Sequence, residues 1–175
     1  MGLVGFSRST GSGGQHVDGE LVVRRVITGV DDVGDASILG DGAVTEVRAL
    51  PNIAGWAIAT VWQNDRAPQV PVRSATEGLT EVADQRLLPT GAIRFLIWQL
   101  PPESAGENPA GMHQTDTIDC IAVLSGTVTL VLGNGDEVEL ATGDCLVQGG
   151  NLHHWRNKTS EACVMAIFMV GAPRV

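Results

Sequence analysis

The chain has 175 residues, a formal net charge of −9 and 43% hydrophobic residues. This length suits one globular domain with a buried core, and the apolar content excludes a disordered chain. Only 11 basic residues are present and they form no stripe, which argues against nucleic acid as a partner.

The first segment, residues 1–19, is rich in Gly and Ser, and we expect a loop-rich, flexible N-terminal arm there. It has no charged region followed by a long apolar stretch, so no secretion signal is expected. No apolar run in the chain approaches the roughly 20 residues of a membrane-spanning helix. These features predict a cytoplasmic protein without a membrane partner.

Short runs rich in β-branched and aromatic residues follow, separated by turn signals. Three of them, at 21–28, 56–62 and 92–100, are expected to be strands that line the interior of the fold. Between the last two, "TEVADQRLL" (80–88) could form a short helix.

The C-terminal half shows the same pattern more clearly. Its apolar runs lie at 117–126, 127–140, 143–150, 152–157 and 162–170, each bounded by Gly, Asn or charged residues. Asn134-Gly135 predicts a type I′ hairpin turn within the second run. Many short strands without a periodic helical segment predict an all-β protein, either a closed antiparallel barrel or a sandwich.

The three cysteines, Cys120, Cys145 and Cys163, are an odd number at wide spacing within apolar runs. We therefore expect buried free thiols in a reducing compartment, in preference to a disulfide.

Polar residues interrupt the apolar pattern in two places. In an extended segment 113–123, alternate residues share one face, which brings a histidine and a carboxylate to the same side. The residues on that face are His113, Thr115, Thr117, Asp119, Ile121 and Val123. A carboxylate in an apolar interior is tolerable only when it is paired or bound to a metal.

The second place is "NLHHWRN" (151–157). His153 shares a strand face with Trp155, and His154 shares the other face with Arg156. Because a large aromatic tends inward and an arginine outward, His153 is the better candidate for the interior.

The segment 106–158 resembles the two conserved motifs of the cupin superfamily. The first family motif is H-x-H, three or four residues, E, six residues, G. It corresponds to residues 111–126, with His113-Gln114-Thr115, then Asp119, then Gly126 at the same intervals. Thr115 therefore stands in place of the second histidine, and Asp119 in place of the glutamate.

The second family motif opens with Gly-Asp and closes with H, three residues, N. It corresponds to residues 143–157, from Gly143-Asp144 to His153 and Asn157. The interval from Gly143 fits His154 instead, as if the loop were one residue short. The stretches are also similar to a group of small single-domain bacterial and fungal cupins with MHRTxTxDY and GDVVVQRGTNHAWRN in the same places, and this closer similarity favours His153.

The resemblance implies an antiparallel jelly-roll β-barrel over residues 20–175, commonly a homodimer, with a metal near the barrel centre. The candidate metal ligands are His113, Asp119 and His153. Two histidines and a carboxylate suit non-haem Fe(II), and the same set would serve Zn²⁺ or Mn²⁺ as a Lewis acid; Ni²⁺ is a further candidate. His113 or His153, when free of the metal, could act as the catalytic base.

Four further residues are candidates for contact with a substrate. The Thr115 hydroxyl and the Gln148 amide could each hydrogen-bond it, although Gln148 could equally cap a loop. Trp155 could form a wall of the site or simply pack in the core. Arg94 could bind a carboxylate inside the barrel or form a surface salt bridge.

Two functions are consistent with these residues. The first is a metal-dependent enzyme acting on a small oxygen-containing molecule, by Lewis-acid chemistry (decarboxylation, dehydration or isomerisation) or by Fe(II) and O₂ chemistry. The alternative is a non-catalytic small-molecule-binding cupin with a degenerate metal site, which the loss of the second histidine supports. The sequence leaves the substrate and the metal open.

Overall fold

The computed structural model describes residues 20–78 and 88–175. The flexible arm expected over 1–19 lies outside these residues, and so does nearly all of the helix expected at 80–88. Among the described residues, the only helical segment is a short 3₁₀ turn, η1 (Glu103–Ala105). The prediction of an all-β protein is therefore confirmed.

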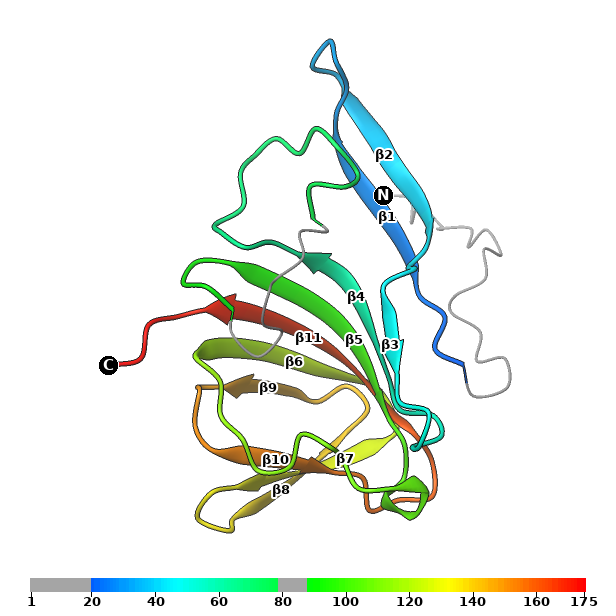
Figure 1. Cartoon of the computed structure of the whole chain (residues 1–175), viewed down its shortest axis with the longest axis vertical. Helices are drawn as coiled ribbons and strands as arrows, with labels where there is room; N and C mark the ends of the chain where they lie inside the picture. The colour runs from blue at the N-terminus through cyan, green and yellow to red at the C-terminus, as the bar shows by residue number, and fades with distance from the viewer. Residues whose placement is uncertain (1–19, 79–87) are drawn as a thin grey trace, which may run out of the picture.

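Figure 1 shows the strands. In chain order they are β1 (Arg24–Val30), β2 (Ala36–Ala43), β3 (Val47–Ala49), β4 (Ala57–Gln63), β5 (Ile93–Leu100), β6 (Thr117–Ser125), β7 (Thr127–Leu132), β8 (Glu137–Ala141), β9 (Cys145–Gln148), β10 (His153–Arg156) and β11 (Cys163–Gly171).

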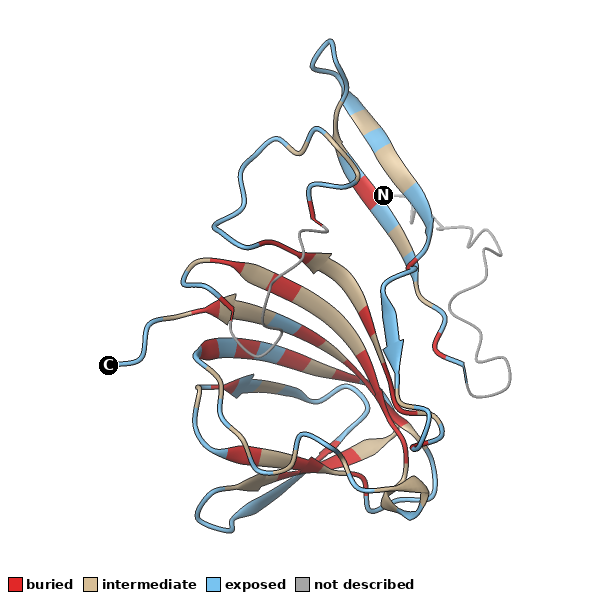
Figure 2. Ribbon diagram, viewed as in Figure 1, coloured by how far each residue is buried: buried red, intermediate tan, exposed pale blue. Residues whose placement is uncertain are grey.

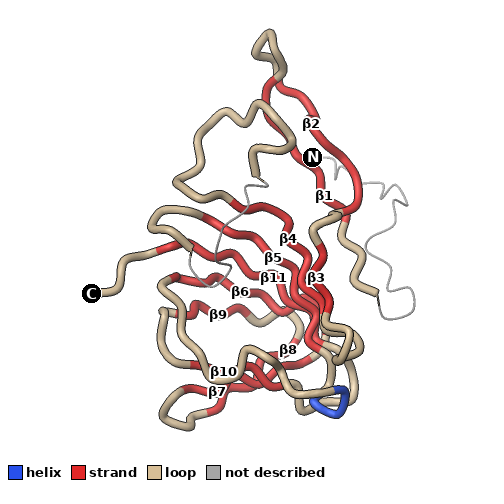
Figure 3. The backbone as a smooth tube through the Cα atoms, viewed as in Figure 1, coloured by secondary structure: helices blue, strands red, loops and turns tan. Residues whose placement is uncertain are grey.

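Two antiparallel sheets form the body of the molecule. One has the strand order β3-β4-β5-β11-β6-β9, and the other β10-β7-β8. Strands that are neighbours in a sheet are often distant in sequence, as in β5-β11-β6, which is the connectivity of a jelly roll. Figure 3 shows the smaller sheet lying against one end of the larger one. The predicted antiparallel jelly roll is confirmed.

The hydrophobic core fills the space between these two sheets. The larger sheet contributes Trp98, Ile121 and Met165, and the smaller sheet contributes Leu130 and Trp155. Figure 2 shows buried and exposed residues alternating along the strands, most clearly in β6. Because Ile121 packs in the core and side chains alternate along a strand, every second residue of β6 points to the interior.

The first predicted strand does not line the interior. Within the described residues, β1 pairs only with β2, in a two-stranded sheet that projects from the body (Figure 1). Leu21 and Val23, just before β1, pack instead against Ala57, Ala59 and other residues on the outer face of β4 and β5. β-Propensity identified a strand but could not assign its partner, because an apolar stripe fits either face of a sheet.

The β7–β8 hairpin is present, but its turn differs from the predicted type I′. The Gly135 N–H bonds to the Leu132 carbonyl at 2.9 Å, so the central residues of the turn are Gly133 and Asn134. Gly135 follows with a φ of +90°. This is the three-residue loop in which a turn is followed by a glycine in the left-handed region.

The three cysteines are free, as predicted, but only one is buried. Cys163 lies in the core, and burial raises the pKa of its thiol to about 11. Cys120 and Cys145 are exposed, because they occupy the outer faces of β6 and β9.

Candidate functional site

Two histidines from distant parts of the chain meet at one end of the inner face. His153 begins β10, and His113 lies in the segment that leads into β6. Their backbones form an isolated β-bridge with two N–H···O bonds of 2.8 Å. Their ring centroids are 4.4 Å apart. The structure thus brings together two of the three predicted metal ligands, and we call them the histidine pair.

Both imidazoles are held by the same kind of hydrogen bond. His113 Nδ1 lies 2.9 Å from the Gly111 carbonyl, and His153 Nδ1 lies 2.9 Å from the Asn151 carbonyl. Because a carbonyl only accepts, each Nδ1 carries its proton, and in the neutral ring the lone pair is on Nε2. A backbone carbonyl on Nδ1 is the usual support of a histidine that binds metal through Nε2.

The charge state of His153 fits this role. Burial lowers the pKa of the His153 imidazole, and the nearby His113 and His154 lower it further, against a raising effect of the Asn151 hydrogen bond. A lowered pKa keeps the ring neutral at pH 7, which is the form that binds metals and accepts protons.

A row of polar side chains crosses the inner face of the larger sheet beside the histidine pair. The strand register aligns Gln63, Arg94, Met169, Asp119 and Gln148 across β4, β5, β11, β6 and β9. All but the methionine are polar, and these four are buried. The neighbouring row on the same inner face, two positions along each strand, is apolar and contains Leu96, Ile167 and Ile121. The polar groups therefore lie in one layer.

Arg94 lies inside the fold and not in a surface salt bridge. It is only 6% exposed, and its Nε donates to Gln63 Oε1 at 2.5 Å. Sequence reasoning missed Gln63, because strict alternation from Ile58 would turn it outward. A register shift between Thr60 and Trp62 brings it to the inner face.

Asp119 is the buried carboxylate of this row, with 5% of its surface exposed. Its Oδ1 has no hydrogen-bond partner among the described residues. Burial raises the pKa of the Asp119 carboxyl, while the Thr117 hydroxyl and the charges of His113 and Arg94 oppose the rise. A buried carboxylate without a partner is costly unless it binds a cation, takes up a proton or accepts a hydrogen bond from a bound molecule.

The remaining predicted contacts have partners within the protein. The Thr115 hydroxyl lies 2.7 Å from that of Thr117. Gln148 is buried and donates to the Asn151 carbonyl at 3.2 Å, the same carbonyl that holds His153. Trp155 is 3% exposed and packs edge-on against Trp98, so it is a core residue that also borders His153.

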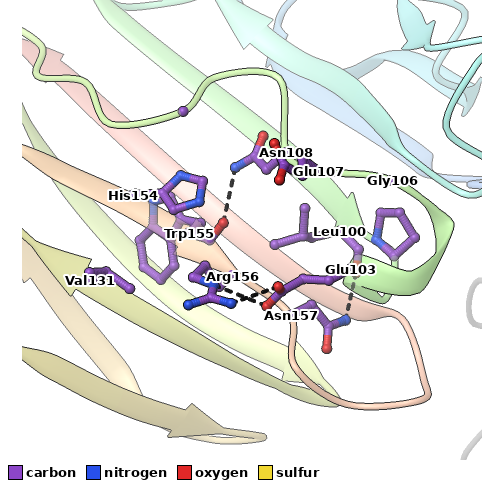
Figure 4. Close-up of a pocket in the computed structure, with 12 residues that line it drawn as sticks. Leu100, Glu103, Gly106, Glu107, Asn108, Val131, His154, Trp155, Arg156 and Asn157 are labelled. Carbon is purple, nitrogen blue, oxygen red and sulfur yellow. Dashed lines mark hydrogen bonds and ion pairs between the residues drawn. The ribbon is translucent and has the colours of Figure 1, made fainter.

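The two adjacent histidines of β10 face opposite sides, as predicted. His153 is buried on the inner face, whereas His154 is half-buried on the outer face with Arg156. There they line a cavity of about 380 Å³ beneath the loop that follows β5 (Figure 4). This cavity is separate from the histidine pair, because β10 lies between them.

The fit of a divalent metal is partial. The histidine pair offers two neutral nitrogen ligands, and Asp119 offers an oxygen without a partner. Across residues 20–78 and 88–175, however, no three His, Cys, Asp or Glu side chains come close enough together to hold a metal ion. Asp119 is therefore a suitable ligand by type, but it would have to move toward the histidine pair.

Comparison with known proteins identifies the domain that carries these residues. Residues 96–171, from β5 to the end of β11, match the family model described as "Cupin domain". Phomopsin biosynthesis cluster proteins C′ and D of Diaporthe leptostromiformis are each 41% identical over 82 residues, which are 47% of this chain. The match spans 41% of the length of those relatives.

The solved structures that this chain resembles are similar to it at low sequence identity. A double-stranded β-helix protein from Klebsiella pneumoniae is 16% identical, with a TM-score of 0.47, over 73% of this chain and 84% of its own. A DMSP lyase from Ruegeria pomeroyi is 12% identical, with a TM-score of 0.39, over 47% and 40%. Within the described residues, no helix is long and apolar enough to cross a membrane. The stretch at residues 96–171, which carries the histidine pair and Asp119, is thus a cupin domain.

Proposed function

We propose that this protein is a metal-dependent cupin enzyme that acts on a small, oxygen-rich molecule at the inner face. The observation that carries the proposal is the histidine pair, with each Nδ1 held by a backbone carbonyl and each Nε2 left with its lone pair. The cofactor is a divalent transition metal (Fe, Mn, Zn or Ni) held by His113 and His153, with Asp119 as the third ligand.

The polar row supports an anionic or carbonyl-containing substrate. Arg94 provides a buried positive charge positioned by Gln63, and Gln148 adds an amide at the other end of the row. The adjacent apolar layer excludes water, which strengthens these interactions. A bound divalent cation would supply Lewis acidity toward a carbonyl or carboxylate, and Fe(II) would add O₂ chemistry.

The histidines have a second possible use in catalysis. Because its pKa is lowered by burial, His153 is neutral at pH 7 and can accept a proton at Nε2. His113 has the same anchored tautomer and could exchange roles with it. The curated relatives are named for a biosynthesis cluster, which agrees with chemistry on a small molecule.

The alternative is a binding protein that holds a small molecule without turnover. Two observations favour it: Thr115 replaces a family histidine, and the described residues contain no three-ligand group. In this case the polar row would bind the ligand directly, and Asp119 would be protonated or accept a hydrogen bond from it.

The metal content of the purified protein distinguishes the metal-dependent enzyme from the binding protein. The experiment is elemental analysis by mass spectrometry of tag-free protein prepared without chelator. We expect near-stoichiometric metal in the wild type and in His154→Ala, which alters only the outward histidine, and loss of metal in His113→Ala/His153→Ala. Asp119→Asn should lower metal retention without unfolding the protein.

Two results would overturn the enzyme proposal. One is a wild type that takes up no Fe(II), Mn(II), Zn(II) or Ni(II) during anaerobic reconstitution, which would favour the binding protein. The other is a double histidine variant that retains metal as well as the wild type does, which would place the metal elsewhere.

We also propose that the protein is a cytoplasmic homodimer. Support for the dimer comes from the outer face of β11, β6 and β9, where the side chains are apolar and partly exposed. These include Ile118, Leu124, Val147 and Phe168, and no charged side chain lies among the outward residues of these strands. An exposed apolar face of this kind marks an interaction site.

A further inference from the structure

A second candidate site lies on the outer side of β10, away from the histidine pair. The cavity of about 380 Å³ lies between the loop 101–111 and the outward side chains of β10 and β7, and it is partly open to solvent. Figure 4 shows His154 and Arg156 on β10, with Arg156 joined to Glu103, and Glu107 and Asn108 of the loop at the other side of the cavity. A volume of this size is in the range of small-molecule sites, about 300–1,000 Å³.

The loop is held at both ends and stands away from the strand between them. At its start, Arg156 forms two hydrogen bonds with the Glu103 carboxylate, at 3.1 and 2.8 Å. Beyond its end, the His113 backbone is bonded to β10. In the middle, the hydrogen bond from the loop to β10 among the described residues is Asn108 Nδ2 to the Trp155 carbonyl, at 3.3 Å. The cavity is the space that this span leaves open.

The charges around the cavity favour a cation. The Glu103 carboxylate is already paired with Arg156, whereas Glu107 is exposed and forms no ion pair with a described residue. Glu107 acts electrostatically on Arg156, and so does Glu137 of neighbouring β8, but Glu137 is itself paired with Lys158 and adds no net charge. The two carboxylates in the lining, Glu103 and Glu107, thus outnumber its one guanidinium, so an anion would be repelled and a cation attracted.

The rest of the lining is suited to a hydrocarbon. Leu100 and Pro101 contribute apolar atoms from the loop side, and Val131 contributes them from β7. The His154 imidazole lies beside them and can hydrogen-bond in either tautomer. The lining therefore combines a negatively charged rim with an apolar surface, the complement of a short organic amine.

We propose that this cavity binds a small organic amine, with its ammonium group at Glu107 and its hydrocarbon body against Pro101 and Val131. The site uses the opposite face of β10 from the histidine pair, so it stands whether or not the protein binds metal. It nevertheless shares the loop with that pair, because Gly111 lines the cavity and its carbonyl holds His113 Nδ1.

The test uses three probes of similar shape and different charge: phenethylamine, 2-phenylethanol and 3-phenylpropionate. Each is titrated into the ¹⁵N-labelled full chain at pH 7.5, and amide chemical shifts are followed. We expect phenethylamine to give saturable shifts in residues 101–111 and 153–156. The alcohol and the carboxylate should bind at least tenfold more weakly.

Two variants assign the charge. Glu107→Gln should weaken phenethylamine binding about fivefold or more, whereas Glu139→Gln, which removes an exposed carboxylate of β8 outside the cavity, should not. Both positions are exposed, so folding is not at risk. The proposal is overturned if phenethylamine causes no saturable shifts, if the three probes bind equally, or if Glu107→Gln binds the amine as well as the wild type.

Discussion

Asp119 is the residue at which stability and function conflict most directly. Its carboxyl is buried, and its pKa is raised from the ordinary value of 3.8, chiefly by burial. In the window between 3.8 and this raised pKa, the folded state binds more protons than the unfolded state. The free energy of unfolding therefore falls as pH rises through the window, and the loss is complete above the folded pKa.

Asp119→Asn should reverse this dependence in chelator-treated protein. Asparagine does not titrate, so the stability of the variant relative to the wild type should increase as pH rises above about 4 and then level off. Urea unfolding at intervals from pH 4 to pH 8 measures the difference, with Glu139→Gln as the control for removal of one exposed charge. A difference that stays constant over this range would show that Asp119 is not the group responsible.

Much of the inner face was predictable from single residues. Alternation placed Thr117, Asp119 and Ile121 together, and the pairing of His153 with Trp155 chose the inward histidine correctly. Gln63 could not be predicted, because a register shift in β4 is set by pairing with β5 and leaves no mark in the sequence of either strand.

Among the connections between elements, the β6–β7 junction is constrained both in backbone conformation and in space. Gly126 has a φ of +77°, and a Cβ at this position would lie 2.7 Å from the Ala162 carbonyl oxygen. Gly135, in the β7–β8 turn, has a φ of +90° but no atom within 4 Å of such a Cβ. A substitution at Gly135 therefore tests backbone strain alone, whereas a substitution at Gly126 tests backbone strain and steric overlap together.

Gly126→Ala should destabilise the protein more than Gly135→Ala. The left-handed conformation alone costs about 1–2 kcal/mol for a residue with a Cβ. At Gly126 the overlap with the Ala162 backbone should add about 1–3 kcal/mol, as overpacking does elsewhere. Urea unfolding of both variants gives the comparison. Equal losses in the free energy of unfolding would mean that the 161–163 segment moves away from the added methyl group without an energetic cost.

Sequence patterns predicted where strands and hairpins form better than they predicted which strands pair with each other. The apolar run at 127–140 and its Asn-Gly pair predicted a hairpin, which is present, whereas the turn type depends on which hydrogen bonds close the loop. The run at 21–28 predicted a strand, but β1 pairs with β2 outside the barrel. Pairing of this kind is decided by long-range contacts that one strand does not encode.

At the scale of the whole molecule, the two cupin-like motifs and the alternation of apolar and polar residues along the strands predicted the fold. They did not predict which surfaces of the fold are apolar and exposed. The larger sheet has two apolar faces. Its inner face packs on the smaller sheet, and its outer face is covered at β4 by Leu21 and Val23. Over β11, β6 and β9 the outer face is open, with Phe168 39% and Val147 68% exposed. A twofold dimer would bury this face against itself, because each copy presents the same patch.

Phe168→Glu should convert the proposed dimer to a monomer. The ring of Phe168 lies 6.5 Å from that of Phe95, among outward apolar side chains, so a carboxylate there would be buried opposite its own copy in the dimer. Val33→Glu is the matched control, since Val33 is 82% exposed in the turn between β1 and β2. Light scattering after size-exclusion chromatography should give twice the chain mass for the wild type and Val33→Glu, and one chain mass for Phe168→Glu. A monomeric wild type would remove the dimer, and a dimeric Phe168→Glu would place its interface on another face.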